Sequence, residues 1–215
     1  MPTPKAGYFL ADGSRVPGVT TIIGYCKIGG IEPLLSWANR MGLEGKSHRD
    51  ERDKAADAGT LAHAMIERDI LGHTVAMEGE VDLIAKATSA YGAYCEWATQ
   101  SRLEIIGTEM GLVSERHKYG GTPDAIGKIN GRVVLLDWKT SNSVYADHLI
   151  QLAAYKALVE ECTDWKIEGF HLCRFAKEHG DFAHHYYPDL SEAWDAFLHM
   201  RALYEIGKQL KKRAA

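Results

Sequence analysis

The dipeptide Asn130-Gly131 lies between two apolar runs, and it constrains the fold of this 215-residue chain more than any other feature. Asn-Gly in this setting predicts a two-residue β-hairpin, because a type I′ turn requires positive φ at both central positions. In such a hairpin Ile129 faces Arg132, and each step back along one strand is matched by one step forward along the other. Counting outward in this way predicts that Asp124 faces Asp137.

Two facing carboxylates create an electrostatic problem, since opposed Cβ atoms of an antiparallel pair are only about 4.5–5.5 Å apart. Something cationic is therefore expected between Asp124 and Asp137. Strand side chains alternate, so Lys139 emerges on the same face as Asp137. A bulge at Gly127 would shift the register and turn Asp124 away. A surface hairpin with both acids in solvent is the other alternative, but "VVLLDW" is apolar on both faces and indicates a central strand, where unpaired carboxylates are costly.

The rest of the chain predicts an α/β fold with a mixed central β-sheet flanked by helices. Helical periodicity dominates about residues 1–100, a sheet with one helix occupies about 101–190, and a terminal helix covers about 190–212. We expect 1–215 to form a single domain. The candidate strands are 103–115, 122–129, 132–140, 165–175 and 181–188, and the candidate helix within the sheet region runs from about Ala146 to Glu161.

A hard divalent cation is the most economical partner for the two aspartates. Mg²⁺ is typically held by one or two carboxylates, several waters and a phosphate oxygen of the substrate. Such an ion polarises the phosphate, lowers the pKa of a bound water and offsets charge on the leaving oxygen. Lys139 would then hold the attacking water or stabilise the crowded phosphate charge.

The motifs around this hairpin resemble those of the PD-(D/E)xK nuclease superfamily. "GTPDAI" and "LLDWKT" resemble its two core motifs, with Asp124 in the first and Asp137 and Lys139 in the second. "GTLAHAMIE" at 59–67 resembles the upstream helix of the RecB-type exonuclease branch, and "QLAAY" at 151–155 resembles that branch's Q-x-x-x-Y helix. All four motifs follow the family order. The resemblance implies a restriction-endonuclease-like nuclease core with an N-terminal helical region.

The resemblance also assigns roles to individual residues. Asp124, Asp137, His63 and the main-chain carbonyl of Trp138 would bind Mg²⁺ or Mn²⁺, and Lys139 would assist the nucleophilic water. Helical spacing places Gln151 and Tyr155 on one face, where an amide and a phenol can bind a phosphate or orient Lys139; packing of Tyr155 in the core is the alternative. Residues expected only near the site are Glu67, Glu109, Gly121, Thr122 and Thr140.

These observations predict a metal-dependent deoxyribonuclease, most simply an exonuclease of DNA recombination, repair or phage DNA processing. A structure-selective endonuclease or junction resolvase is one alternative. A non-catalytic DNA-binding subunit on a nuclease fold is another, although binding alone would not require Lys139 beside two acids. The expected partner is linear DNA with free ends, with a recombination or single-strand-binding protein as a candidate protein partner.

Charge, apolar runs and cysteine spacing argue against several classes of protein. A net charge of −4 and a pI near 6.2 argue against coating nucleic acid by bulk charge. No apolar run of membrane-spanning length and no signal peptide pattern is present, so we expect a cytoplasmic protein of a bacterial or phage-infected cell without membrane contact.

The cysteines (Cys26, Cys95, Cys162, Cys173) are scattered, which predicts reduced thiols and no iron–sulfur cluster. His171, His184 and His185 lack zinc-site spacing.

Overall fold

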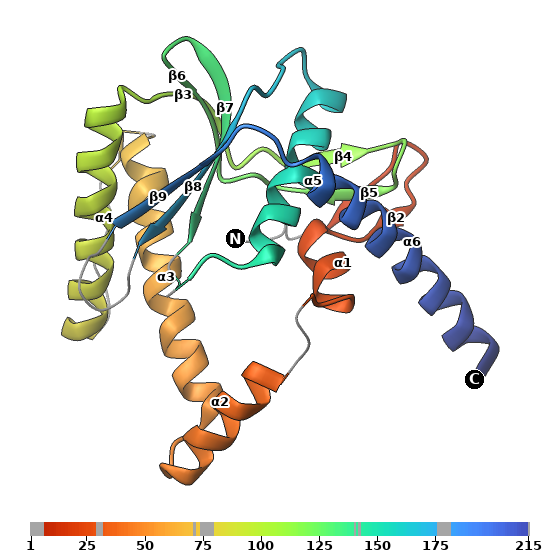
Figure 1. Ribbon diagram of the computed structural model, residues 1–215, viewed down its shortest axis with the longest axis horizontal. Coiled ribbons are helices and arrows are strands. Elements are labelled where there is room, and N and C mark those ends of the chain that lie inside the picture. Colours follow the sequence, from red (N-terminus) through yellow and green to blue (C-terminus); the bar gives the residue numbers. More distant parts are fainter. Residues whose placement is uncertain are drawn as a thin grey trace.

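The computed structural model describes residues 7–28, 32–70, 72–73, 80–139, 141, 143–175 and 182–214. Figure 1 shows the arrangement of its helices and strands. The helices are α1 (Val19–Tyr25), α2 (Glu32–Leu43), α3 (His48–Ile70), α4 (Val81–Ser101), α5 (Ala146–Cys162) and α6 (Ser191–Ala214). The strands are β1 (Tyr8–Phe9), β2 (Arg15–Val16), β3 (Glu104–Thr108), β4 (Leu112–Ser114), β5 (Tyr119–Gly121), β6 (Ala125–Ile129), β7 (Arg132–Lys139), β8 (Phe170–Phe175) and β9 (Phe182–Tyr187).

The central sheet has five strands in the order β3-β6-β7-β8-β9. All neighbours pair antiparallel except β7 and β8, which are parallel because α5 returns the chain to the same end of the sheet. The predicted α/β fold with a mixed sheet is therefore confirmed, and β7 is the central strand, as its two apolar faces indicated.

The β6–β7 hairpin has the predicted register. Ile129 pairs with Arg132 and Ala125 pairs with Leu136, with no bulge between them. Asn130 and Gly131 have φ of 52° and 79°, the positive values that a type I′ turn requires. The only irregularity around β6 lies on its other side, where the pairing with β3 shifts between Ile105 and Gly107.

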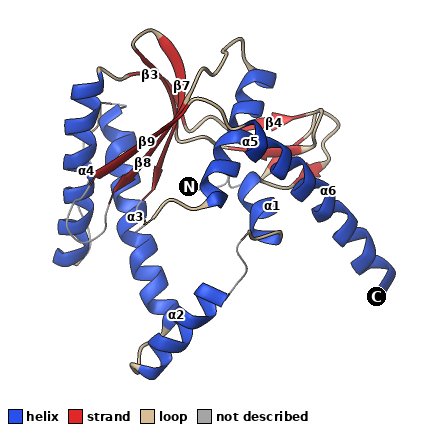
Figure 2. Cartoon of the chain, in the orientation of Figure 1, coloured by secondary structure: helices blue, strands red, loops and turns tan. Residues whose placement is uncertain are grey.

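Helices cover both faces of this sheet, as Figure 2 shows. One face of β6, β7 and β8 packs with α1, α5 and α6, in a core that includes Ile126, Leu135 and Leu172. The opposite face packs against α3 and α4, in a second core that includes Leu136 and Trp138. Because side chains alternate along β7, Asp137 and Lys139 share the α5 face with Leu135. The site residues of β7 thus lie under α5, while Trp138 faces α3 and α4.

Three expected strands differ from the structure, one of them because β8 begins at Phe170 and residues 165–169 of the expected strand 165–175 lie before it. Residues 103–115 form two strands, β3 and β4, because Glu109 between them has a φ of 48° that no strand continues through. Residues 122–129 become a strand only from Ala125 onward. Strand β4 leaves the central sheet and pairs with β5 in a small separate ribbon.

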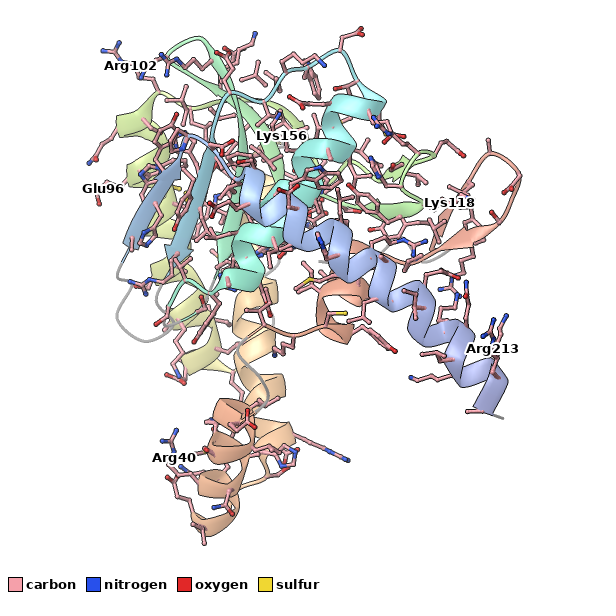
Figure 3. The ribbon with its side chains drawn as sticks, turned by 45° about the vertical axis from the view of Figure 1, so that its right-hand side comes forward. Arg40, Glu96, Arg102, Lys118, Lys156 and Arg213 are labelled. Carbon is pink, nitrogen blue, oxygen red and sulfur yellow. The ribbon has the colours of Figure 1, made fainter. Side chains whose placement is uncertain are left out.

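Two parts of the chain extend away from the sheet. Helix α2 packs against α3 as an arm, and the second half of α6 projects beyond the body of the fold. In Figure 3, Arg40 marks the arm and Arg213 marks the end of α6. None of the helices in the described part of the chain combines the length and the apolarity needed to span a bilayer.

Candidate active site

Asp124 and Asp137 meet where the β6–β7 ladder ends, and both side chains are completely buried. Asp124 Oδ2 accepts a hydrogen bond of 2.8 Å from the backbone N–H of Trp138. The Asp124 carbonyl accepts a second bond, of 2.9 Å, from Thr108 Oγ1. Strands β3 and β7 therefore hold Asp124 from two sides, opposite Asp137, as the hairpin count predicted.

Lys139 supplies the cation expected beside these acids. Its Nζ donates a hydrogen bond of 2.9 Å to Asp137 Oδ1. It also forms an ion pair with Asp137 Oδ2 at 2.7 Å. The Lys139 side chain is only 18% exposed. The amine is thus an integral member of the site, and it sits on Asp137 more closely than on Asp124.

Burial sets the protonation of this trio. It raises the pKa of Asp124, against the opposing effect of Lys139, and it raises the pKa of Asp137 to about 6. Burial acts to lower the pKa of Lys139, but the charges of Asp137 and Asp124 outweigh it and raise that pKa. The lysine is therefore protonated at neutral pH, and one positive charge faces two carboxyls that resist ionising together.

His63 reaches the same strand from α3. Its Nε2 lies 2.8 Å from the carbonyl oxygen of Trp138, so this nitrogen carries the proton and donates. Burial, aided by the charge of Lys139, lowers the pKa of His63 to about 4. A neutral imidazole thus contacts the Trp138 carbonyl, which the family resemblance assigns as a metal ligand. His63 approaches it from the sheet face opposite to Asp137.

Gln151 and Tyr155 lie on α5, above the α5 face of the sheet. Gln151 Nε2 donates a hydrogen bond of 2.9 Å to Tyr155 Oη, which leaves the phenol hydrogen available. Burial raises the pKa of Tyr155 well above its usual value, so the phenol stays protonated. A Cβ on Gly121 would come within 2.7 Å of the Tyr155 ring. Gly121 therefore makes room for Tyr155.

Glu109 and Glu67 extend the acidic cluster. Burial, together with the charges of Asp124 and Glu67, raises the pKa of Glu109 to about 7, so the three carboxyls influence one another electrostatically. Thr122 lies close in the chain, but its hydroxyl bonds Tyr8 Oη at 2.9 Å. Thr140 lies outside the described residues.

His148 lies near the candidate site and was not among the residues predicted from the sequence. The charges of Lys139 and Asp137 both act on its imidazole, whose pKa burial lowers to about 4. His148, Gln151 and Tyr155 are spaced three and four residues apart on α5, so they share one helix face. Extending the Q-x-x-x-Y face by one turn would have identified it.

The donors present fit a hard divalent cation. Asp124 Oδ1 is buried and has no hydrogen-bond partner, and the Asp137 carboxyl and the Lys139 amine act on the same carboxyl. The His63 imidazole bonds the Trp138 carbonyl. A buried anionic oxygen without a partner is costly unless a ligand completes it. Within the described residues, however, no group of three or more His, Cys, Asp or Glu side chains converges closely enough to hold a metal by itself. Water and substrate oxygens would have to complete the coordination, as is usual for Mg²⁺.

Comparisons with known proteins give only distant structural similarity. No protein-family model matches the chain, and no curated protein matches it. Among solved structures, SSO0001 is 19% identical with a TM-score of 0.34, over 56% of this chain and 58% of SSO0001. The alkaline exonuclease LHK-Exo from Laribacter hongkongensis is 14% identical over 75% of this chain and 92% of its own, with a TM-score of 0.36. Its complex with dAMP has the same identity and coverage and a TM-score of 0.37. The site's chemistry therefore rests on its own geometry.

Proposed function

We propose that this chain is a metal-dependent deoxyribonuclease that hydrolyses phosphodiester bonds, as an exonuclease of recombination, repair or phage DNA processing. One observation carries the proposal: two fully buried carboxyls face each other, one with an oxygen that accepts no hydrogen bond, and a protonated lysine contacts the other. A hydrophobic core gains nothing from such a trio, which is costly to bury. A cation and an anionic substrate would complete it.

Asp124, Asp137 and the Trp138 carbonyl would hold Mg²⁺ or Mn²⁺ in this proposal, with His63 either as a further ligand or as the donor that orients the carbonyl. When bound, the ion supplies polarisation of the phosphate and a more acidic water. The backbone N–H of Trp138 fixes Asp124 Oδ2, so Oδ1 is the oxygen left for coordination.

Lys139 and the α5 pair act on the substrate. The ammonium group of Lys139 is fixed beside Asp137, where it would hold the attacking water or stabilise negative charge on the phosphate. Tyr155 accepts from Gln151 and keeps its own hydrogen, which it would donate to a phosphate oxygen. These groups are held by hydrogen bonds before the substrate arrives, so little reorganisation is needed.

End-labelled linear DNA and closed circular single-stranded DNA, each with Mg²⁺, Mn²⁺ or EDTA, test the proposal in one experiment. We expect metal-dependent loss of linear DNA and survival of the circle. Cleavage of the circle would indicate an endonuclease or resolvase. Binding without cleavage under every metal condition would indicate a non-catalytic subunit, and full activity in excess EDTA would refute the metal requirement.

A further inference from the structure

His148 occupies the first turn of α5, directly before the Gln151–Tyr155 pair on the same helix face. Tyr155 is buried against Gly121, and Gln151 donates a hydrogen bond to Tyr155. The part of this helix face between Gln151 and Tyr155 is therefore already occupied. His148 is one turn closer to the start of the helix and is only partly buried. It therefore lies where the α5 face opens from the site toward solvent.

The ring of His148 is held in one tautomer. Its Nδ1 accepts a hydrogen bond of 3.3 Å from the backbone N–H of Tyr145, the N-cap residue of α5. The Tyr145 ring packs edge-on against it, with centroids 5.4 Å apart. With Nδ1 accepting, the proton of the neutral imidazole resides on Nε2. The free end of the ring is thus a hydrogen-bond donor.

The surroundings of the ring keep it neutral. Burial and then Lys139 lower the pKa of His148, while Asp137 acts in the opposite direction. A neutral donor beside Lys139 adds a contact for an anionic oxygen without adding a second positive charge. This would suit a phosphate group that Lys139 already neutralises in part.

We propose that His148 is a substrate-binding residue whose Nε2–H donates a hydrogen bond to a phosphate oxygen of the DNA strand being cleaved. The inference rests on the proposed nuclease function and adds a donor to it. The competing role is purely structural. The hydrogen bond from the Tyr145 N–H to Nδ1 caps α5, and such a cap stabilises the helix whether or not a substrate binds.

Two substitutions separate these roles. In His148→Asn the short amide can occupy the position of Nδ1 and keep the cap, but nothing replaces Nε2–H. In His148→Gln the longer amide can place an N–H near the position of Nε2. We expect His148→Asn to melt like wild type and to raise KM for linear DNA about tenfold or more, as loss of a hydrogen bond to a charged group does. His148→Gln should stay within about threefold of wild type. Since the contact binds substrate and transition state alike, kcat should change little.

His199→Asn is the matched control, because His199 is an exposed histidine on α6 whose Nδ1 also makes a local backbone contact. A wild-type KM in folded His148→Asn would overturn the proposal and leave only the cap. Imidazole ¹⁵N NMR of wild type tests it without a variant: the Nε2–H form is expected, with its resonance shifted by a bound oligonucleotide, and an Nδ1–H form or no shift would overturn it. Failure of the nuclease function itself is distinct, since wild type would then cut no DNA with any metal.

Discussion

Two polar clusters lie on the same central sheet and satisfy their polar groups in opposite ways. At one end of β7, Asp124, Asp137 and Lys139 bring three ionisable groups together, and Asp124 Oδ1 accepts no hydrogen bond. On the α4 face of β8 and β9, His171 Nδ1 and His184 Nε2 lie 2.7 Å apart and bond each other. Burial lowers the pKa of His171 to about 4, so this second cluster is neutral.

The difference separates a site from a structural pair. Trp97 lies obliquely near His184, with ring centroids 5.4 Å apart, and the two imidazoles share one hydrogen bond. This imidazole pair is neutral. The aspartate pair has the reverse character, because its charges are like and its acceptors exceed its donors. A bound cation would offset the negative charge of the two carboxylates and occupy the unpaired Oδ1 of Asp124, and a phosphate would bind the cation and Lys139.

The largest expected effect is the loss of DNA cleavage when a residue of the charged cluster is substituted. Lys139→Ala should lower kcat on linear DNA by at least about a hundredfold, because the amine is the only cation seen in contact with the buried acids in the described structure. Steady-state cleavage of end-labelled DNA measures this.

The neutral cluster provides the comparison for that experiment. His184→Asn removes one imidazole of the ring pair and should leave cleavage within about threefold of wild type, since small effects are usual away from a site. If His184→Asn lost as much activity as Lys139→Ala, the division into site and structural pair would be wrong.

Metal binding should produce the next largest effect. A cation that binds only the folded protein stabilises it by about 2.7 kcal/mol at a hundredfold excess over Kd. Mg²⁺ or Mn²⁺ should therefore raise the melting temperature of wild type measured against EDTA. Asp124→Asn should abolish the increase, whereas His184→Asn should retain it. An equal increase in Asp124→Asn would place the ion elsewhere.

Parts of this picture were predictable from sequence because they follow rigid local rules. The alternation of strand side chains and the Asn130-Gly131 turn determine that Asp124 faces Asp137 as long as no bulge interrupts β6, and β6 pairs with β7 without one. The kink at Glu109 was not predictable, since a glutamate at a φ of 48° is stabilised by tertiary surroundings and not by its own preference. The bond between Tyr8 and Thr122 joins residues 114 positions apart, and no local pattern contains it.

The contact of Lys139 with Asp137 predicts that the two aspartates differ in their effect on metal-free stability. Asp124→Asn keeps an oxygen that can accept the hydrogen bond from the Trp138 N–H. It also removes a buried carboxyl whose pKa burial raises, so this variant should be at least as stable as wild type in EDTA. Asp137→Asn removes the partner of the buried Lys139 and should melt lower. Melting of both variants in EDTA measures this, and the reverse order would show that Lys139 pairs mainly with Asp124.

The smallest effect concerns Glu109, whose folded pKa of about 7 lies above its ordinary value of 4.5, mainly through burial. A carboxyl with a raised folded pKa destabilises the protein as it ionises, so wild type should lose stability relative to Glu109→Gln as pH rises from about 4.5 to 7, with no further change above. His63 and His148, whose pKa values are lowered to about 4, act with the opposite sign, but both proteins contain them and their effects cancel in the difference. In EDTA the melting temperature of Glu109→Gln minus that of wild type should therefore increase from pH 5 to pH 8. Saturating Mg²⁺ should shrink this increase, because a nearby cation favours the ionised carboxyl. A difference that stays flat with pH in EDTA would show that Glu109 ionises freely and does not belong to the charged cluster.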